Sequence, residues 1–152
     1  MKILLYRGKS IVSRLIRLQT RSVYSHVAVQ IEDNGSVIEA WHKNGVRRIA
    51  SPFHDHTIGT HIDVYTIDAS YDRDAVKQFL YNQVGKKYDF GAIARFLSRR
   101  HEFADNKWFC SELCLAAFEH GGLRLLNGNP SELSPRDVAL SPLLTFEKTI
   151  GG

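Results

Sequence analysis

Apolar residues alternate with polar ones along much of the first half of the chain. This pattern predicts strands, which are expected over residues 2–6, 24–32, 37–41, 46–50 and 60–67. Asn34-Gly35 and Asn44-Gly45 lie between three of these segments, and Asn-Gly is typical of tight β-hairpin turns. Most of the first half is therefore expected to form antiparallel strands joined by tight turns.

A helical period appears in one early segment and through the second half. It predicts helices over residues 10–18, 72–84, 89–99 and 106–120. Asp105 or Asn106 is expected to cap the last helix and Gly121-Gly122 to end it. The segment that follows holds three of the four prolines and is expected to be a long ordered loop. Strands followed by helices favour the α+β class, with an antiparallel sheet packed against helices, in a single domain over residues 1–152.

Composition and charge narrow the possible partners. Lys and Arg number 20 and Asp and Glu 16, giving a net charge of +4, which permits an acidic partner without requiring one. Lys9, Arg14, Arg17 and Arg21 surround the first helix, where a solvated face is favoured over a nucleic-acid patch because aromatic residues do not interleave. No apolar segment reaches the roughly 18 residues of a membrane span. The apolar stretch near Met1 is too short for a signal peptide, so a cytoplasmic location is expected.

The two cysteines, Cys110 and Cys114, stand four residues apart on one predicted helix. That spacing is poor for a disulfide, so both are expected to be reduced thiols. Cys110 falls near the start of its helix, where the helix dipole favours a thiolate and hence a nucleophile. A buried helical cysteine is an equally good interpretation of Cys110 from the residues alone. Cys114, in the middle of the apolar stripe, is expected to pack in the core.

A cysteine nucleophile needs a base, and His26, at the start of a predicted strand, is a candidate. The other histidines considered for the role are His54, His56, His61, His101 and His120, and spacing does not choose among them. Zinc binding is the rival interpretation, by His54, Asp55 and His56 with His61, or by Cys110 with Cys114. Neither spacing matches a standard zinc motif, so no metal and no cofactor is expected.

Five segments together resemble a known family. They are Ser25–Val29, Val37–Ala40, Gly85–Gly91, Phe109–Leu113 and Ser134–Asp137. Their residues and order are similar to those of the circularly permuted NlpC-type, papain-like cysteine hydrolases (the YiiX-like group). The resemblance implies a permuted papain-like fold and a cysteine hydrolase that acts on an amide, ester or thioester of a small molecule, peptide or lipid. It also implies roles for four residues: Cys110 as nucleophile, His26 as general base, Glu39 as the group that orients the imidazole, and Tyr88 as a donor near the oxyanion.

The third member of the site stays open between Glu39 and His42. A two-residue turn at Asn34-Gly35 would set Gln30 opposite Glu39, on the same face as His26 but about 13 Å along the strand. The register must then shift by an even number of residues, or a bulge must bring Glu39 closer. A shift of one residue would place His42 on that face, resembling the His-His-Cys site of the lecithin:retinol acyltransferase group. A non-catalytic binding module of the same fold is a further alternative.

Overall fold

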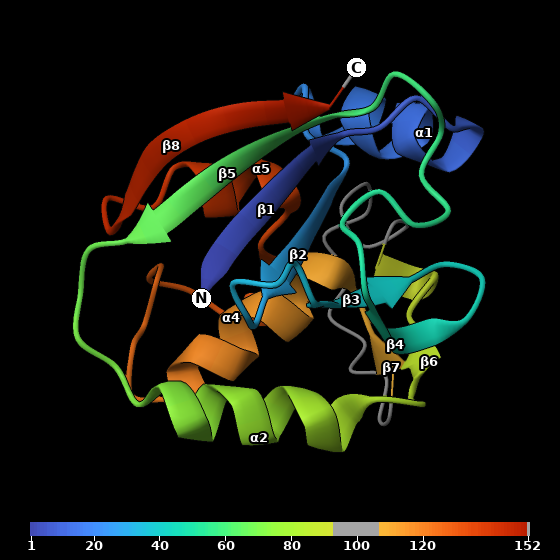
Figure 1. The fold of residues 1–152 in the computed structure, drawn as a ribbon. Helices are drawn as coiled ribbons and strands as arrows, with labels where there is room; N and C mark the ends of the chain where they lie inside the picture. The colour runs from blue at the N-terminus through green and yellow to red at the C-terminus, as the bar shows by residue number, and fades with distance from the viewer. Residues whose placement is uncertain (93–106, 152) are drawn as a thin grey trace.

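A six-stranded antiparallel sheet forms the centre of the molecule in the computed structural model, which describes residues 1–92 and 107–151 (Figure 1). The strand order is β4-β3-β2-β1-β5-β8. The strands are β1 (Lys2–Arg7), β2 (His26–Gln30), β3 (Val37–Trp41), β4 (Gly45–Ile49), β5 (His61–Ile67) and β8 (Leu144–Gly151). A parallel pair of two-residue strands, β6 (Lys87–Tyr88) and β7 (Lys107–Trp108), lies beside β4.

Helices pack mainly against one face of this sheet. They are α1 (Ile11–Thr20), α2 (Arg73–Gln83), α4 (Cys110–His120) and α5 (Pro135–Ala139), with a 3₁₀ turn η1 (Pro130–Glu132). Val27, Val29 and Ile38 point to the α4 face and share one core cluster with Leu113 and Phe118. The expected α+β class, with an antiparallel sheet packed against helices, is confirmed. Among the described residues, no helix combines the length and apolarity needed to cross a bilayer.

The opposite face of the sheet holds a smaller cluster that includes Leu4, Tyr6, Ala28 and Val37. Side chains alternate along a strand, so His26 shares this face with Ala28, and Glu39 shares it with Val37. His26 and Glu39 are both buried.

The turn between β2 and β3 differs from the predicted two-residue turn at Asn34-Gly35. Ile31 and Ser36 are hydrogen-bonded, and Gly35 N–H donates to the carbonyl of Glu32, so four residues form the turn. Gln30 therefore pairs with Val37 rather than with Glu39. The predicted two-residue turn is wrong, but the register shift of two residues is the even shift expected from the sequence, and it keeps every side chain on its predicted face.

Two other predictions are wrong near the site and in the tail. The helix predicted over 106–120 begins only at Cys110, because Lys107 and Trp108 pair with β6 in an extended conformation. The proposed caps at positions 105 and 106 lie outside the described residues. The tail is not a loop, since it forms α5 and the edge strand β8. Of the helix predicted over 89–99, residues 91–92 are helical and the rest lies outside the described residues.

Candidate active site

Cys110 is the first helical residue of α4 and is buried. Phe109 precedes it as the N-cap in an extended conformation, and the Glu112 carboxylate accepts a hydrogen bond from Phe109 N–H at 3.4 Å. N–H groups in the first turn of a helix have no acceptor within the helix, and they form its positive end. The Cys110 thiol therefore sits at the positive end of α4, next to backbone N–H groups that have no acceptor within the helix.

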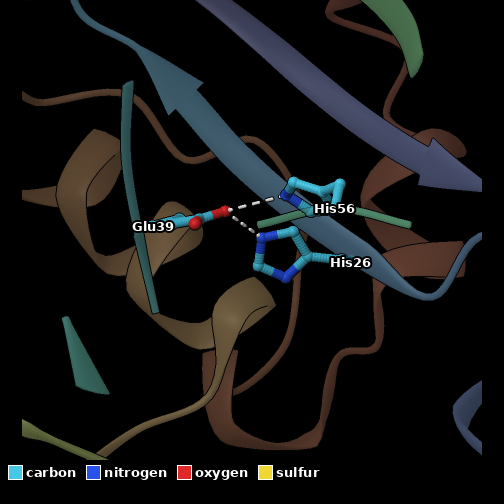
Figure 2. A group of neighbouring side chains, drawn as sticks. All are labelled: His26, Glu39 and His56. Atoms are coloured by element: carbon cyan, nitrogen blue, oxygen red, sulfur yellow. Dashed lines mark hydrogen bonds and ion pairs between the residues drawn. The ribbon is translucent and has the colours of Figure 1, made fainter. Parts of the chain in front are cut away.

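His26, the first residue of β2, connects Cys110 to Glu39. Its Nε2 atom lies 2.7 Å from Oε2 of Glu39 (Figure 2), which leaves Nδ1 for the hydrogen bond between the ring and Cys110. Burial acts to lower the pKa of His26. The charge and hydrogen bond of Cys110, followed by those of Glu39, outweigh burial and raise the pKa of His26 to about 9. The protonated imidazole of His26 is thus favoured.

Arg47 holds the other oxygen of Glu39. It lies directly opposite Glu39 in the β3–β4 ladder, and its Nε and Nη2 atoms donate to Oε1 at 2.9 and 2.7 Å. Burial acts to raise the pKa of Glu39, but the hydrogen bond from His26 and the nearby His56 imidazole lower it below its usual range. Glu39 is therefore a fixed carboxylate, with one oxygen on Arg47 and the other on His26. Sequence patterns did not single out Arg47. Once the β3–β4 register is known, its positive charge opposite the negative charge of Glu39 identifies it.

His56, from the loop between β4 and β5, is a second histidine at the same carboxylate. Its Nε2 lies 3.6 Å from Oε2 of Glu39 (Figure 2), beyond hydrogen-bond distance, and no other acceptor or donor among the described residues meets it. Its ring stacks on Tyr6, with centroids 4.3 Å apart, and meets the Trp41 ring edge-on at 4.6 Å. Burial and the charge of His26 lower the pKa of His56, so the neutral ring is favoured.

Tyr88 reaches the site because β6 packs closely against β4. Gly45 adopts a φ of +74°, and a Cβ there would collide with the carbonyl oxygen of Lys86. That carbonyl accepts from Val46 N–H at 2.8 Å, which holds the strand carrying Tyr88 in place. Burial raises the pKa of Tyr88 well above its usual value, and the negative charges of Cys110 and Asp89 raise it further. The phenol therefore stays protonated and can donate a hydrogen bond.

The remaining sequence candidates lie apart from this group. Cys114 is buried one turn further along α4, and burial together with the charge of Cys110 raises its pKa. His42 packs against the Trp41 ring at 4.6 Å, and Glu39, not His42, bonds to Nε2 of His26. The exposed histidines are His54, His61 and His120, and position 101 lies outside the described residues.

The metal ligands considered from the sequence do not assemble as a set. Of His54, Asp55, His56 and His61, only His56 brings its ring to Glu39, whereas the Asp55 carboxylate accepts from Arg47 Nη1 at 2.6 Å. The structure instead gathers His26, Glu39 and His56, whose ligand atoms all lie within 4.8 Å of one another. Two imidazoles and a carboxylate are a donor set that suits zinc, although Arg47 already occupies one carboxylate oxygen.

Comparisons with known proteins agree with this fold. The crystal structure of the metalloprotein yiiX from Escherichia coli O157:H7 superposes with a TM-score of 0.75, at 20% identity over 99% of this chain and 97% of that chain. A search of curated proteins found no match. A family model described as "Permuted papain-like amidase enzyme, YaeF/YiiX, C92 family" matches residues 3–131, which is most of the chain. The protein therefore belongs to the YaeF/YiiX family of permuted papain-like amidases.

Proposed function

We propose that this protein is a cysteine hydrolase in which Cys110 attacks an acyl carbonyl, His26 transfers protons and Glu39 orients His26. The observation that carries the proposal is the placement of His26, which is hydrogen-bonded to Cys110 on one side and to Glu39 on the other. The amidase family supports an amide as the natural substrate. The same chemistry applies to esters and thioesters.

Acylation uses the ion pair of Cys110 and His26. The Cys110 thiolate forms a bond to the carbonyl carbon, and the carbonyl electrons move to oxygen. The tetrahedral intermediate then collapses, the bond to the leaving nitrogen breaks, and His26 Nδ1 gives its proton to that nitrogen. The products of this half-reaction are a free amine and a thioester on Cys110. In the second half-reaction His26 takes a proton from water, and hydroxide releases the acid from Cys110.

Two groups support the negative oxygen of the tetrahedral intermediate. The first is the backbone N–H of Cys110, which stands at the positive end of α4. The second is the protonated phenol of Tyr88, whose pKa is affected by the charge of Cys110. The phenol adds to a backbone donor that is already present, so its contribution is the smaller of the two.

Variant kinetics on an activated acyl anilide test these roles. Cys110→Ala is expected to abolish turnover, and His26→Ala to lower kcat/KM by roughly a hundredfold or more, with circular dichroism unchanged. Tyr88→Phe is expected to have a milder effect. A folded His26→Ala enzyme as active as the wild type would contradict the proposed base. Product analysis with an added alcohol or amine then decides whether the acyl group passes to water or, as in the lipid acyltransferase alternative, to another acceptor.

A second candidate function is divalent-metal binding by His26, Glu39 and His56. The observation in its favour is His56, whose buried Nε2 has no hydrogen-bond partner among the described residues and faces Glu39. The E. coli neighbour is also described as a metalloprotein. Two features oppose a resident metal: Arg47 places a positive charge on the same carboxylate, and His26 Nε2 is already bonded to Glu39.

The two candidates exclude each other at His26. A metal on Nε2 would displace the Glu39 hydrogen bond and leave the proton on Nδ1, so His26 would no longer accept a proton from water. A zinc titration with a chromophoric chelator, run with an activity assay, separates them. The thiol proposal predicts full activity after treatment with a chelator, inhibition by added zinc, and relief of that inhibition in His56→Phe. Activity that is lost with the chelator and restored by zinc would favour the metal.

A further inference from the structure

Helix α1 carries an apolar stripe that the core does not use. Ile16 is buried and Val12 packs against the main core. Three other apolar residues point to solvent: Ile11 is 87% exposed, Leu15 46% and Leu18 77%. Positions 11, 15 and 18 are spaced i, i+4 and i+7, so they form one line along the helix. A single exposed leucine needs no explanation, but an aligned set on a short helix marks an interaction surface.

Positive charges flank this exposed stripe. Arg14 lies within α1, Lys9 precedes it and Arg21 follows it, and α1 itself contains no acidic residue. Among the described residues, no carboxylate is paired with any of the three, since the ion pairs there all involve other cations. As far as the described residues go, their charges are available to an outside partner.

An open hollow connects the stripe and the charges. Arg14, Arg17, Leu18, Arg21, Ser22 and Val23 line it. Arg17 also donates to the carbonyl of Gly8, which anchors it at the edge of this hollow. Three guanidinium groups beside exposed apolar side chains match the two parts of a phospholipid, its phosphate and its acyl chain.

The loop between β4 and β5 extends the surface beyond α1. Figure 1 shows this loop passing near α1 at one end of the sheet. Gly59 lies against the ammonium group of Lys9, and its neighbour Ile58 is almost fully exposed. The loop thus adds an exposed apolar side chain next to Lys9, on the same side of the molecule as α1.

We propose that α1 docks this protein onto a bilayer surface that contains anionic lipids. The helix has the features of an interfacial helix, with an exposed apolar line, arginines at its border and no acidic residue. Charge complementarity favours this partner. Arg14 and Arg21 form no ion pair with a carboxylate among the described residues, and anionic headgroups would neutralise them.

The position of α1 determines where a docked bilayer would lie relative to His26. The helix connects the end of β1 to the start of β2, whose first residue is His26. Ser25, just before His26, accepts a hydrogen bond from Gly8 N–H, just before the helix. A bilayer on α1 would therefore lie at the end of the sheet where His26 is found. Bilayer docking depends on this surface alone and stands whether or not the hydrolase proposal is correct.

Vesicle co-sedimentation of the full chain tests the proposal. Vesicles of phosphatidylcholine mixed equally with phosphatidylglycerol are compared with pure phosphatidylcholine vesicles, at about 0.1 and about 0.5 M salt. The protein is expected to bind the anionic vesicles at low salt, and to bind them weakly at high salt. Equal binding to both vesicle types, or no binding to either, would overturn the proposal.

Matched variants locate the surface. The double variant Leu15→Ser, Leu18→Ser removes the apolar line. The double variant Arg14→Gln, Arg21→Asn removes two positive charges. Asn is chosen at position 21 because it tolerates the φ of +48° there. Each pair is expected to weaken anionic-vesicle binding by about tenfold or more. Val84→Ser, an exposed apolar residue just beyond the end of α2, is the control and should bind like the wild type. Circular dichroism checks the fold of each variant.

Sedimentation velocity without vesicles addresses the rival occupant, a second copy of the chain. The proposal predicts the same sedimentation coefficient for the wild type and for the Leu15→Ser, Leu18→Ser variant. A wild-type dimer that this variant converts to a monomer, together with equal vesicle binding by both, would show that the stripe joins two copies and would overturn bilayer docking.

Discussion

The Nε2 atom of His26 and the Oε2 atom of Glu39 lie 2.7 Å apart in a buried environment. The contact uses one ring nitrogen completely, so the other one faces Cys110. It also places a negative charge behind the imidazole at the point where a positive charge would develop. Glu39 can hold this position because Arg47 fixes its second oxygen.

Replacing Glu39 with Gln is expected to lower kcat/KM and to change its pH dependence. The hydrogen bond and charge of Glu39 help to raise the pKa of His26 to about 9. Acylation needs the protonated imidazole, so activity should fall as the pH rises through about 9 in the wild type. In Glu39→Gln this alkaline decline should move to lower pH. A pH profile of kcat/KM measures it, and an unchanged alkaline limb would contradict the role of Glu39.

Arg47→Lys tests whether the guanidinium positions Glu39. Two N–H groups of Arg47 converge on one carboxylate oxygen, and an ammonium group cannot reproduce that geometry. We expect kcat to fall by roughly tenfold with KM nearly unchanged, and the alkaline limb to shift as in Glu39→Gln. Arg48→Lys is the matched control, since Arg48 is the next residue of β4 and points away from Glu39, towards Ser36. A wild-type pH profile in Arg47→Lys would assign Arg47 to stability alone.

The two thiols should differ sharply in alkylation. Cys110 is hydrogen-bonded to His26 at the start of α4, whereas burial and the charge of Cys110 raise the pKa of Cys114. Iodoacetamide near neutral pH should modify Cys110 first, as read by mass spectrometry of peptides. His26→Ala should slow that reaction. Faster labelling of Cys114 would be incompatible with Cys110 as the nucleophile.

Gly45→Ala should destabilise the fold more than Gly85→Ala. Both glycines have positive φ, at +74° and +92°, so both variants carry similar backbone strain. Only at Gly45 does a Cβ meet the backbone of Lys86, while the space at Gly85 is open. We expect the free energy of unfolding of Gly45→Ala to be lower by an additional amount of roughly 1–3 kcal/mol. Urea denaturation of the two variants measures the difference, and equal midpoints would contradict the close approach.

The faces of the strands could be predicted from the sequence, but their register could not. The alternation of side chains along the strands placed Glu39 and His26 on one face of the sheet. That placement depends only on whether the number of residues in the turn is even or odd. Their separation depended on the turn, which has four residues rather than the two that Asn34-Gly35 suggested. The length and composition of the segment between β2 and β3 do not distinguish a two-residue turn from a four-residue turn, because Asn-Gly is compatible with both.

Other elements were missed because their signals are weak or non-local. The strand β8 is an exposed edge strand, so it lacks the clear alternation of a half-buried strand. Residues 107–108 fall within the predicted helix because Asp105 or Asn106 was expected to cap it, whereas pairing with β6 makes them extended. His56 lies in a loop, and only the three-dimensional fold brings it to Glu39.

The most direct test of cysteine catalysis is to trap the acyl-enzyme. The protein is mixed with an activated acyl ester, quenched with acid within seconds and analysed by intact mass and peptide mapping. We predict one acyl group per chain, attached to Cys110, absent in Cys110→Ala and strongly reduced in His26→Ala. An acyl group on any other residue, or turnover that persists in Cys110→Ala, would contradict cysteine catalysis at this site.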